Sequence, residues 1–289
     1  MIGMTKGQKA FSVFNLLFLT LLSLSMLYPF LYVLAGSFSS GQAISQGRVT
    51  VFPIDSTLAN YTAVLSNPGI WRSFGVTLFI TAAGTLVNLL LTALMAYGLS
   101  HRELKGRSLI LILVLFTMIF QAPMIPSYLL VKSMAMLDTL WSLILPSAIS
   151  AFNLIIMISF FQNIPQSLLD AAKIDGCGEY RTLWKVVLPL SIPSLCTIGL
   201  FYAVAHWNGY FQAVMYITKP KLYPLQLKLR QLIVENQAEQ MMQTASLTLQ
   251  SLEGIKMATI IIASVPILLV YPFIQKHFIK GAMLGSIKG

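Results

Sequence analysis

The run FGVTLFITAAGTLVNLLLTALMAYGL, residues 74–99, contains 26 residues and no charged side chain. An α-helix needs about 20 apolar residues to cross the hydrocarbon core of a bilayer, so this run is long enough to span a membrane. The rest of the chain has the same character, because 56% of its 289 residues are hydrophobic, 10% are charged and the mean hydropathy is +0.77. These values exclude an ordinary water-soluble globular protein and indicate an all-α integral membrane protein.

Six apolar runs are long enough to be transmembrane helices, with approximate limits Phe11–Leu34, Phe74–Leu99, Ser108–Leu130, Leu140–Phe161, Leu188–Ile217 and Met257–Ile274. Pro123 and Pro126 interrupt the third run, and we expect a kink or a break there because proline lacks a backbone donor. The first run follows two lysines, as in a secretory signal, but it is too long for one. We therefore expect an uncleaved first helix, and a mature N-terminus near Gly36 would refute this.

Basic residues in the short connections predict the orientation of the helices. An even number of spans puts both termini on one side, together with the connections at 100–107 and 162–189. That side carries eleven basic and four acidic residues, and the opposite side eight and five. The cluster HRELKGR at 101–107 favours the cytoplasm for that side and for both termini. The orientation of the helices in the membrane then accounts for most of the net charge of +10. The cations are scattered between the apolar runs, and this does not indicate nucleic-acid binding.

The chain divides into an N-terminal part, residues 1–70, and a core of five helices, residues 71–289. The first part holds a cytoplasmic tail, the first helix and an outer loop. The core includes the 162–189 segment and an outer loop at 218–256, whose stretch QLIVENQAEQMMQTASLTLQ fits a docking element and a solvated connector equally well. Cys177, Cys196 and three dispersed histidines predict no disulfide, metal site or catalytic centre.

The 162–189 segment contains SLLDAAKIDGCGEYRTLWKVVLP from Ser167 to Pro189, a polar stretch between apolar runs. Ser167 and Asp170 have the spacing of a capping-box-like helix start. Asp175 and Gly176 can end this short helix, because glycine tolerates the left-handed conformation at a helix C-terminus. The pattern therefore predicts one short helix over about Leu168–Ile174.

A second helix is predicted from Glu179 to about Val187, with Pro189 stopping it or beginning the next span. Helical spacing would put four apolar residues on one face, namely Tyr180, Leu183, Trp184 and Val187. Arg181 and Lys185 would share another face. The predicted helix-turn-helix would lie at the cytoplasmic surface and contact a partner protein; the alternative is an amphipathic hairpin resting on lipid headgroups.

The spacing of this segment resembles the coupling-loop signature of ATP-binding-cassette (ABC) importer permeases. Asp170 to Ala172 match its Glu-Ala-Ala element, Asp175 and Gly176 match its Asp-Gly pair, and Pro189 follows thirteen residues after the glycine. Asp170 replaces the usual glutamate and keeps its charge, and Cys177 replaces the usual alanine and keeps a small volume. The stretches IPSYLLV, HWNGYF and FIKGAMLGSIKG are also similar to the second permease subunit of maltose-type carbohydrate importers, in the oligosaccharide and polysaccharide branch.

This resemblance implies a six-helix type I importer permease in a bacterial cytoplasmic membrane. Its expected partners are a homologous second permease, two ATPase subunits that bind ATP and Mg²⁺, an extracytoplasmic solute-binding protein and an oligosaccharide. The expected ATPase-coupling residues are Asp170, Ala171, Ala172, Asp175, Gly176, Glu179, Arg181 and Pro189. The chain itself would hold no catalytic residue, metal or cofactor, and it contains no GxxxxGK[ST] loop for phosphate.

A translocation route needs polar groups at membrane depth, and seven residues are candidates: Asn88, Gln121, His206, Trp207, Asn208, Tyr210 and Gln212. Aromatic faces suit sugar rings and amides bond hydroxyls. Each of these residues suits helix packing equally well. Basic residues on the outer side would suit an acidic, uronate-containing saccharide, but also lipid phosphates or a binding protein: Lys219, Lys221, Lys228 and Arg230.

Two other classes fit the hydropathy. An ion-coupled secondary transporter of a small polar solute would place ionisable groups in mid-membrane and carry an inverted repeat. Apart from His206, the acidic and basic residues lie outside the runs or at their edges, and the sequence shows no convincing repeat. A membrane-embedded enzyme would gather a nucleophile, a base or metal ligands at one depth, and the sequence shows no such group.

Overall fold

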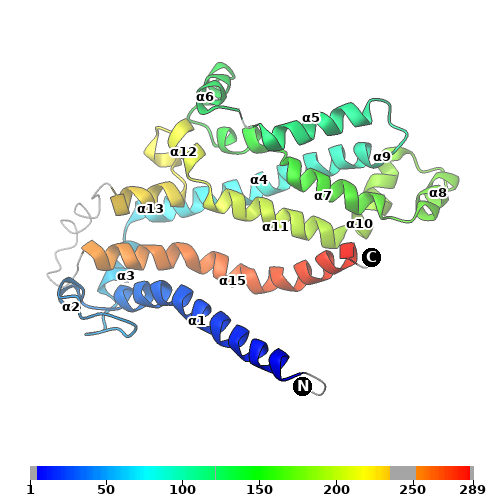
Figure 1. Cartoon of the computed structure of the whole chain (residues 1–289). Helices are drawn as coiled ribbons and strands as arrows, with labels where there is room; N and C mark the ends of the chain where they lie inside the picture. Colours follow the sequence, from blue (N-terminus) through cyan, green and yellow to red (C-terminus); the bar gives the residue numbers. More distant parts are fainter. Residues whose placement is uncertain (1–4, 121, 235–251, 287–289) are drawn as a thin grey trace. The chain divides into compact units, whose positions relative to one another are not determined.

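The computed structural model describes residues 5–120, 122–234 and 252–286, which are mostly helical and contain no β-strand (Figure 1). The predicted all-α class is therefore confirmed. The chain forms two compact units. The first unit consists of Met1–Ile70 and Leu229–Val265, and the second of Trp71–Lys228 and Pro266–Gly289. The sequence did not predict the grouping of 229–265 with the N-terminal part, and the division into 1–70 and 71–289 stays a prediction.

Three helices are by themselves long and apolar enough to cross a membrane: α1 (Lys6–Ser37), α4 (Pro68–Ser100) and α15 (Leu252–Ser286). Three bent pairs also meet this criterion. Helices α5 (Arg107–Ile119) and α6 (Met124–Ser133) meet at 117°. The 3-10 helices η1 (Leu140–Leu143) and η2 (Leu145–Ser147) meet α7 (Ala151–Gln162) at 55°, and Glu179–Leu190 meets α11 (Ile192–Asn208) at 84°. If each bent pair crosses once, the described residues hold the six predicted spans.

The first unit is built around the C-terminal end of α1 and two short helices, α2 (Gly41–Ser45) and α3 (Ala59–Leu65). Its small apolar cluster consists of Ala35, Ala43, Ile44 and Val49. The buried Asn60 ties the backbone after α1, because its Nδ2 donates to the carbonyls of Ser37 and Ser39 at 3.2 and 3.0 Å. The apolar length of α1 is exposed within the chain, as expected for a helix surrounded by lipid or by another subunit.

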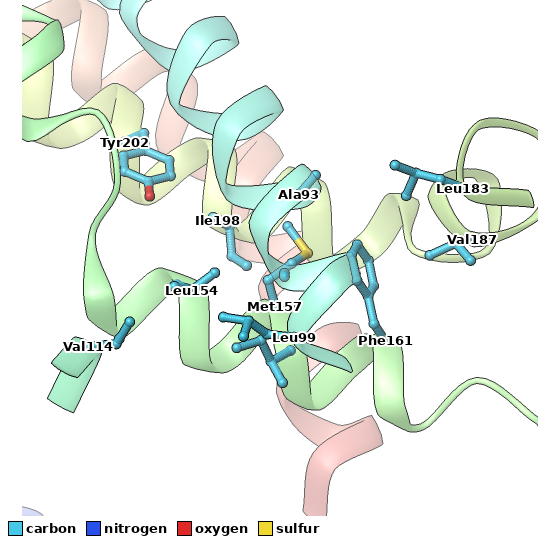
Figure 2. Close-up of a cluster of buried hydrophobic side chains, with 12 residues drawn as sticks. Ala93, Leu99, Val114, Leu154, Met157, Phe161, Leu183, Val187, Ile198 and Tyr202 are labelled. Carbon is cyan, nitrogen blue, oxygen red and sulfur yellow. The ribbon is translucent and has the colours of Figure 1, made fainter. Parts of the chain in front are cut away.

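The second unit has an apolar core shared by α4, α5, α7, α11 and the 162–189 segment (Figure 2). Leu154, Met157 and Ile198 are fully buried at its centre. Leu183 and Val187 enter this core from the 162–189 segment and are 2% and 1% exposed. Truncation of a buried leucine costs about 2–5 kcal/mol, so this contact anchors the second half of the segment firmly.

Two expected helix limits were wrong. The fifth run does not continue as one helix to Ile217, because α11 ends at Asn208 and a separate helix, α12 (Phe211–Tyr216), follows. Gly209 is extended there and breaks the helix.

At the N-terminal end of α11, Pro189 neither stops the preceding helix nor begins α11. The helical backbone runs to Leu190, and the bend falls at Ser191, just before Pro193 enters the first turn of α11.

Beyond α12, the chain forms the 3-10 helix η4 (Pro220–Leu222) and α13 (Leu225–Val234). The glutamine-rich stretch predicted as a docking element or connector lies mostly outside the described residues.

Candidate functional site

The 162–189 segment forms the predicted helical hairpin, with one helix beginning earlier than expected. Helix α8 (Gln166–Ile174) begins after Pro165, so Ser167 lies inside the helix and makes no cap. The predicted capping box is therefore wrong. Proline at the start supplies a fixed φ and needs no donor partner, and Asp170 instead accepts a hydrogen bond from Gln166 Nε2 at 3.2 Å.

The turn after α8 has the predicted geometry. Asp175 is the C-cap residue, and Gly176 adopts a φ of +75°, which disfavours residues with a Cβ. The amides of Gly176 and Cys177 donate to the carbonyls of Lys173 and Ala172 at 3.0 and 2.9 Å. The turn is thus closed by its own backbone, and Gly176 is needed for its conformation.

The second half of the hairpin consists of α9 (Glu179–Thr182), the π-helical turn η3 (Leu183–Val187) and α10 (Leu188–Leu190). The apolar face predicted for it is divided. Leu183 and Val187 are buried in the core, whereas Tyr180 and Trp184 are 79% and 55% exposed. Helical spacing predicted that these four apolar residues share one face of the helix. It did not show that only Leu183 and Val187 pack inward.

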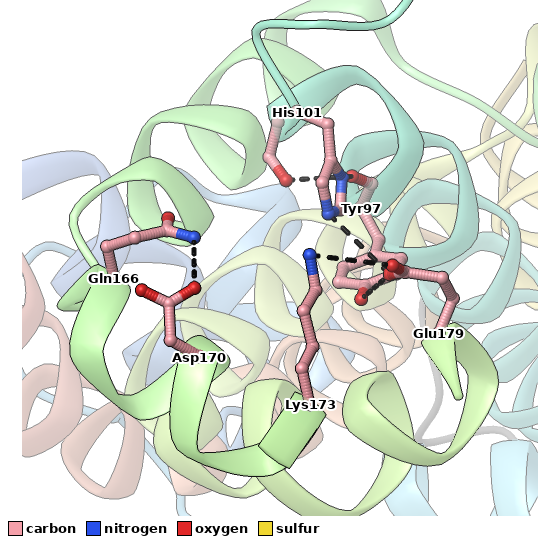
Figure 3. A network of polar contacts seen from close by, with 7 residues as sticks. Tyr97, His101, Gln166, Asp170, Lys173 and Glu179 are labelled. Atoms are coloured by element: carbon pink, nitrogen blue, oxygen red, sulfur yellow. Dashed lines mark hydrogen bonds and ion pairs between the residues drawn. The ribbon is translucent and has the colours of Figure 1, made fainter. Parts of the chain in front are cut away.

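Glu179 joins the hairpin to the C-terminal end of α4 (Figure 3). Tyr97 Oη donates to Glu179 Oε2 at 2.6 Å. His101 Nε2 and Lys173 Nζ lie 3.7 and 3.9 Å from the same carboxylate. The last carbonyls of a helix have no intrahelical partners. At the end of α4, the Tyr97 carbonyl accepts from His101 Nδ1 and the Leu99 carbonyl from Arg107 Nε. The Ser100 carbonyl accepts from Gln162 Nε2.

A cavity of about 630 Å³ lies elsewhere in the second unit, between α4, α7, α11 and α12. Of the described residues that line it, none is Asp, Glu, Lys or Arg. Its polar lining consists of amides, hydroxyls and one imidazole, including Asn88, Asn153, His206, Asn208, Tyr210 and Gln212, beside the aromatic rings of Phe152, Phe201 and Phe211. This combination suits a hydroxyl-rich ligand with apolar faces.

Asn88 and His206 form the central polar contact of the cavity. Asn88 Nδ2 lies 3.0 Å from His206 Nε2, and Asn88 is 1% exposed. Whichever partner donates, this contact joins the two side chains between α4 and α11. Gly84 makes room for the ring, because a Cβ at this position would lie 2.5 Å from His206 Nε2. Asn88 Oδ1 has no hydrogen-bond partner among the described residues.

The cavity brings together most of the residues predicted for a translocation route, but not all. Asn88, His206, Asn208, Tyr210 and Gln212 line it. Trp207 does not, since its ring is 7% exposed and packs edge-on against Phe74 with centroids 6.0 Å apart. Gln121 lies outside the described residues.

The predicted ATPase-coupling residues of the hairpin are mostly exposed. Those at the surface include Asp170, Asp175, Arg181 and Pro189, whereas Ala172 is buried.

Sequence reasoning missed several residues of these sites. Tyr97 contacts Glu179, which is 82 positions away in the sequence. Local sequence patterns cannot predict a contact between such distant residues. Tyr202 was missed for the same reason; its Oη bonds Thr92 Oγ1 at 2.7 Å and accepts from the Ser150 amide at 3.0 Å, which fixes the start of α7 beside the cavity. Gly84 could have been suspected as a small residue one turn before Asn88.

A family model for the inner membrane component of binding-protein-dependent transport systems matches residues 95–283, well over half of the chain. The chain belongs to this family. The match includes the hairpin, the Tyr97–Glu179 contact and most of the cavity. It confirms the resemblance seen in the 162–189 segment and places the protein among multi-pass inner-membrane permeases of bacterial ABC importers.

Similar proteins cover nearly the whole permease. Protein LplC of Bacillus subtilis (strain 168) is 48% identical over 289 residues, 99% of this chain and 97% of LplC. The polygalacturonan/rhamnogalacturonan transport system permease protein YtcP of the same strain is 47% identical over 274 residues, 94% of this chain and 96% of YtcP. A solved bacterial ABC transporter involved in import of the acidic polysaccharide alginate has a chain with a TM-score of 0.92 and 35% identity, covering 96% of this chain and 100% of that one. The type I permease fold is thereby confirmed.

Proposed function

We propose that this permease is one half of an ATP-driven import channel for oligosaccharides derived from acidic, uronate-containing polysaccharides, and that it works by alternating access. One observation carries the proposal: the second unit holds both an exposed helical hairpin anchored in the core and an uncharged, aromatic-lined cavity. The first is suited to receive force from a partner and the second to hold a sugar. The substrates in the names of YtcP and the alginate transporter support the saccharide class.

The assembly that this function requires contains a homologous second permease, two cytoplasmic ATPase subunits and an extracytoplasmic solute-binding protein. ATP and Mg²⁺ bind to the ATPases, and this chain performs no catalysis itself. Both termini and the 162–189 segment lie in the cytoplasm, which agrees with the basic cluster at residues 101–107. The bacterial inner membrane contains the whole permease.

The ATPase contact is formed by the exposed surface of the hairpin. Ile174 is 86% exposed and Tyr180 79%, and Arg181 is exposed beside them. Exposed apolar and aromatic side chains of this kind are the usual anchors of a protein interface. Asp170, Ala171, Asp175 and Gly176 shape the same surface. A lipid-resting hairpin would also expose such residues, so docking needs a direct test.

The cavity accommodates the sugar through hydrogen bonds and ring contacts. The amides of Asn208, which is exposed, and of Gln212 can bond sugar hydroxyls as donors and acceptors. Since the described lining has no Lys or Arg, an acidic saccharide would be held there without a fixed positive charge. This favours transport through weak, exchangeable contacts over tight binding of an anion.

Reconstitution of the complete complex in proteoliposomes tests this function. We expect uptake of a uronate oligosaccharide that requires internal ATP and the external binding protein. Asp175→Lys should reduce uptake at least tenfold by reversing a charge on the docking surface, while Glu103→Lys, the same change on the neighbouring cytoplasmic connection, should reduce it less than twofold. Uptake driven by an ion gradient in the absence of the ATPases would favour the secondary-transporter alternative, and preferential uptake of a neutral oligosaccharide would refute the acidic substrate class.

A further inference from the structure

Three carboxylates lie in the hairpin, and one of them reaches a membrane-spanning helix. Asp170 accepts from Gln166 within its own helix, and Asp175 caps the same helix. Glu179, at the start of α9, accepts from Tyr97 on α4 (Figure 3). The hairpin is therefore joined to α4 by a charged acceptor as well as by the apolar contacts of Leu183 and Val187.

The Tyr97 hydroxyl dominates the contacts of Glu179. Its 2.6 Å distance is that of a short, charge-assisted hydrogen bond. His101 and Lys173 lie at 3.7 and 3.9 Å with half-exposed side chains, and exposed ion pairs of this length contribute little. His101 instead orients the tyrosine, because its ring packs edge-on against Tyr97 at 4.8 Å and its Nδ1 donates to the Tyr97 carbonyl at 2.9 Å.

Helix α4 connects this contact to the cavity without a break. Asn88 is nine residues before Tyr97 in the same helix, which corresponds to roughly 14 Å along the helix axis. Gly84 and Asn88 hold His206 at the cavity. The short Tyr97–Glu179 hydrogen bond is thus attached to a continuous helix that also carries Asn88 at the cavity.

We propose that Glu179 is a positioning residue that passes movement of the hairpin to α4 through the Tyr97 hydroxyl. This inference rests on the proposed ATP-driven import. Hydrophobic contacts of Leu183 and Val187 hold the hairpin against the core but are not directional. The Tyr97–Glu179 bond is directional, so it fixes how far α4 follows the hairpin when the ATPases close.

The ratio of ATP hydrolysed to saccharide imported in proteoliposomes tests the inference. Tyr97→Phe and Glu179→Ala should each raise this ratio about three- to tenfold, since loss of a hydrogen bond to a charged group costs about a factor of ten or more when buried and less when exposed. The double variant should be no worse than the more severe single variant, because both remove one interaction. Glu179→Gln, which keeps an acceptor for Tyr97, should restore most of the coupling.

Tyr28→Phe is the matched control, because it removes a phenolic hydroxyl from an exposed position of α1; its ratio should equal that of the unmodified complex. A normal ratio for Tyr97→Phe, additive effects in the double variant, or Glu179→Gln as impaired as Glu179→Ala would each overturn the inference. Failure of both single variants to assemble would show a purely structural role and overturn it too. If the unmodified complex showed no ATP-dependent uptake, the proposed function itself would be wrong.

Discussion

The hairpin end and the cavity end of the second unit are held by different kinds of contact, although α4 runs through both. At the hairpin end, carbonyls and the Glu179 carboxylate accept from the hydroxyl, imidazole and guanidinium groups near them, and Leu183 and Val187 are buried in the core. At the cavity, neutral amides, hydroxyls and one imidazole form the polar lining, and the described lining holds no Asp, Glu, Lys or Arg.

This difference shows how one fold combines firm attachment with weak binding. The hydrogen bonds at the end of α4 and the buried side chains of Leu183 and Val187 attach the hairpin firmly to the core. Exposed neutral groups of the cavity, such as the Asn208 amide, leave hydrogen-bonding capacity for a passing solute. Changes at the hairpin end should therefore act on stability and coupling, whereas changes at the cavity should act on uptake.

The largest effect is expected from Leu183→Ala. Removal of this buried side chain should lower the free energy of unfolding by about 2–5 kcal/mol and reduce recovery of the assembled complex. Trp184→Ala, at the next position, is the control, because Trp184 is 55% exposed and should change stability by less than about 1 kcal/mol. Thermal unfolding in detergent measures both, and equal losses would show that the hairpin is not anchored as described.

Gly84→Ala should give the next largest effect, at the cavity end. The new methyl group would lie 2.5 Å from His206 Nε2 and displace the ring from Asn88. We expect uptake to fall about tenfold, in line with the cost of overpacking, with ATPase association unchanged. Adding His206→Ala makes room for the methyl group, so the double variant should assemble as stably as the unmodified chain. Unchanged uptake by Gly84→Ala would remove the Asn88–His206 pair from the route.

The smallest effect is expected at Asp138, between α6 and η1. Its carboxylate accepts from the Thr218 amide at 2.6 Å, the Thr218 hydroxyl at 2.7 Å and the Lys219 amide at 3.1 Å. Hydrogen bonding to Thr218, chiefly from its backbone amide, lowers the pKa of Asp138. The resulting stabilisation is present above the unfolded pKa of about 3.9 and is lost as the pH falls through the lower folded value.

Asp138→Asn should accordingly expose the Thr218 and Lys219 amides to faster hydrogen exchange at pH 7. The difference from the unmodified protein should shrink as Asp138 becomes protonated below about pH 4. The change should be small because the carboxylate is exposed. Exchange rates that differ equally at all pH values would contradict the assigned hydrogen bonds.

The sequence predicted the helical class, the six apolar runs and the hairpin because each depends on local composition and spacing. Gly176 illustrates this, since its left-handed φ follows from the turn that an Asp-Gly pair makes after a short helix. The contacts of Tyr97 and Tyr202 could not be predicted, because they depend on the packing of distant helices. The inward side of Leu183 and the break at Gly209 were missed because hydrophobic periodicity does not identify the neighbour that a side chain meets.

Labelling of one cysteine in the cavity tests the central claim most directly. Asn208→Cys in a chain with Cys177→Ala and Cys196→Ala places the probe on the lining. In oriented proteoliposomes containing the whole complex, a membrane-impermeant maleimide should label this cysteine from opposite sides in the nucleotide-free and the ATP-bound states. Labelling that is independent of nucleotide, or that changes equally without the ATPase subunits, would contradict a cavity controlled through the hairpin.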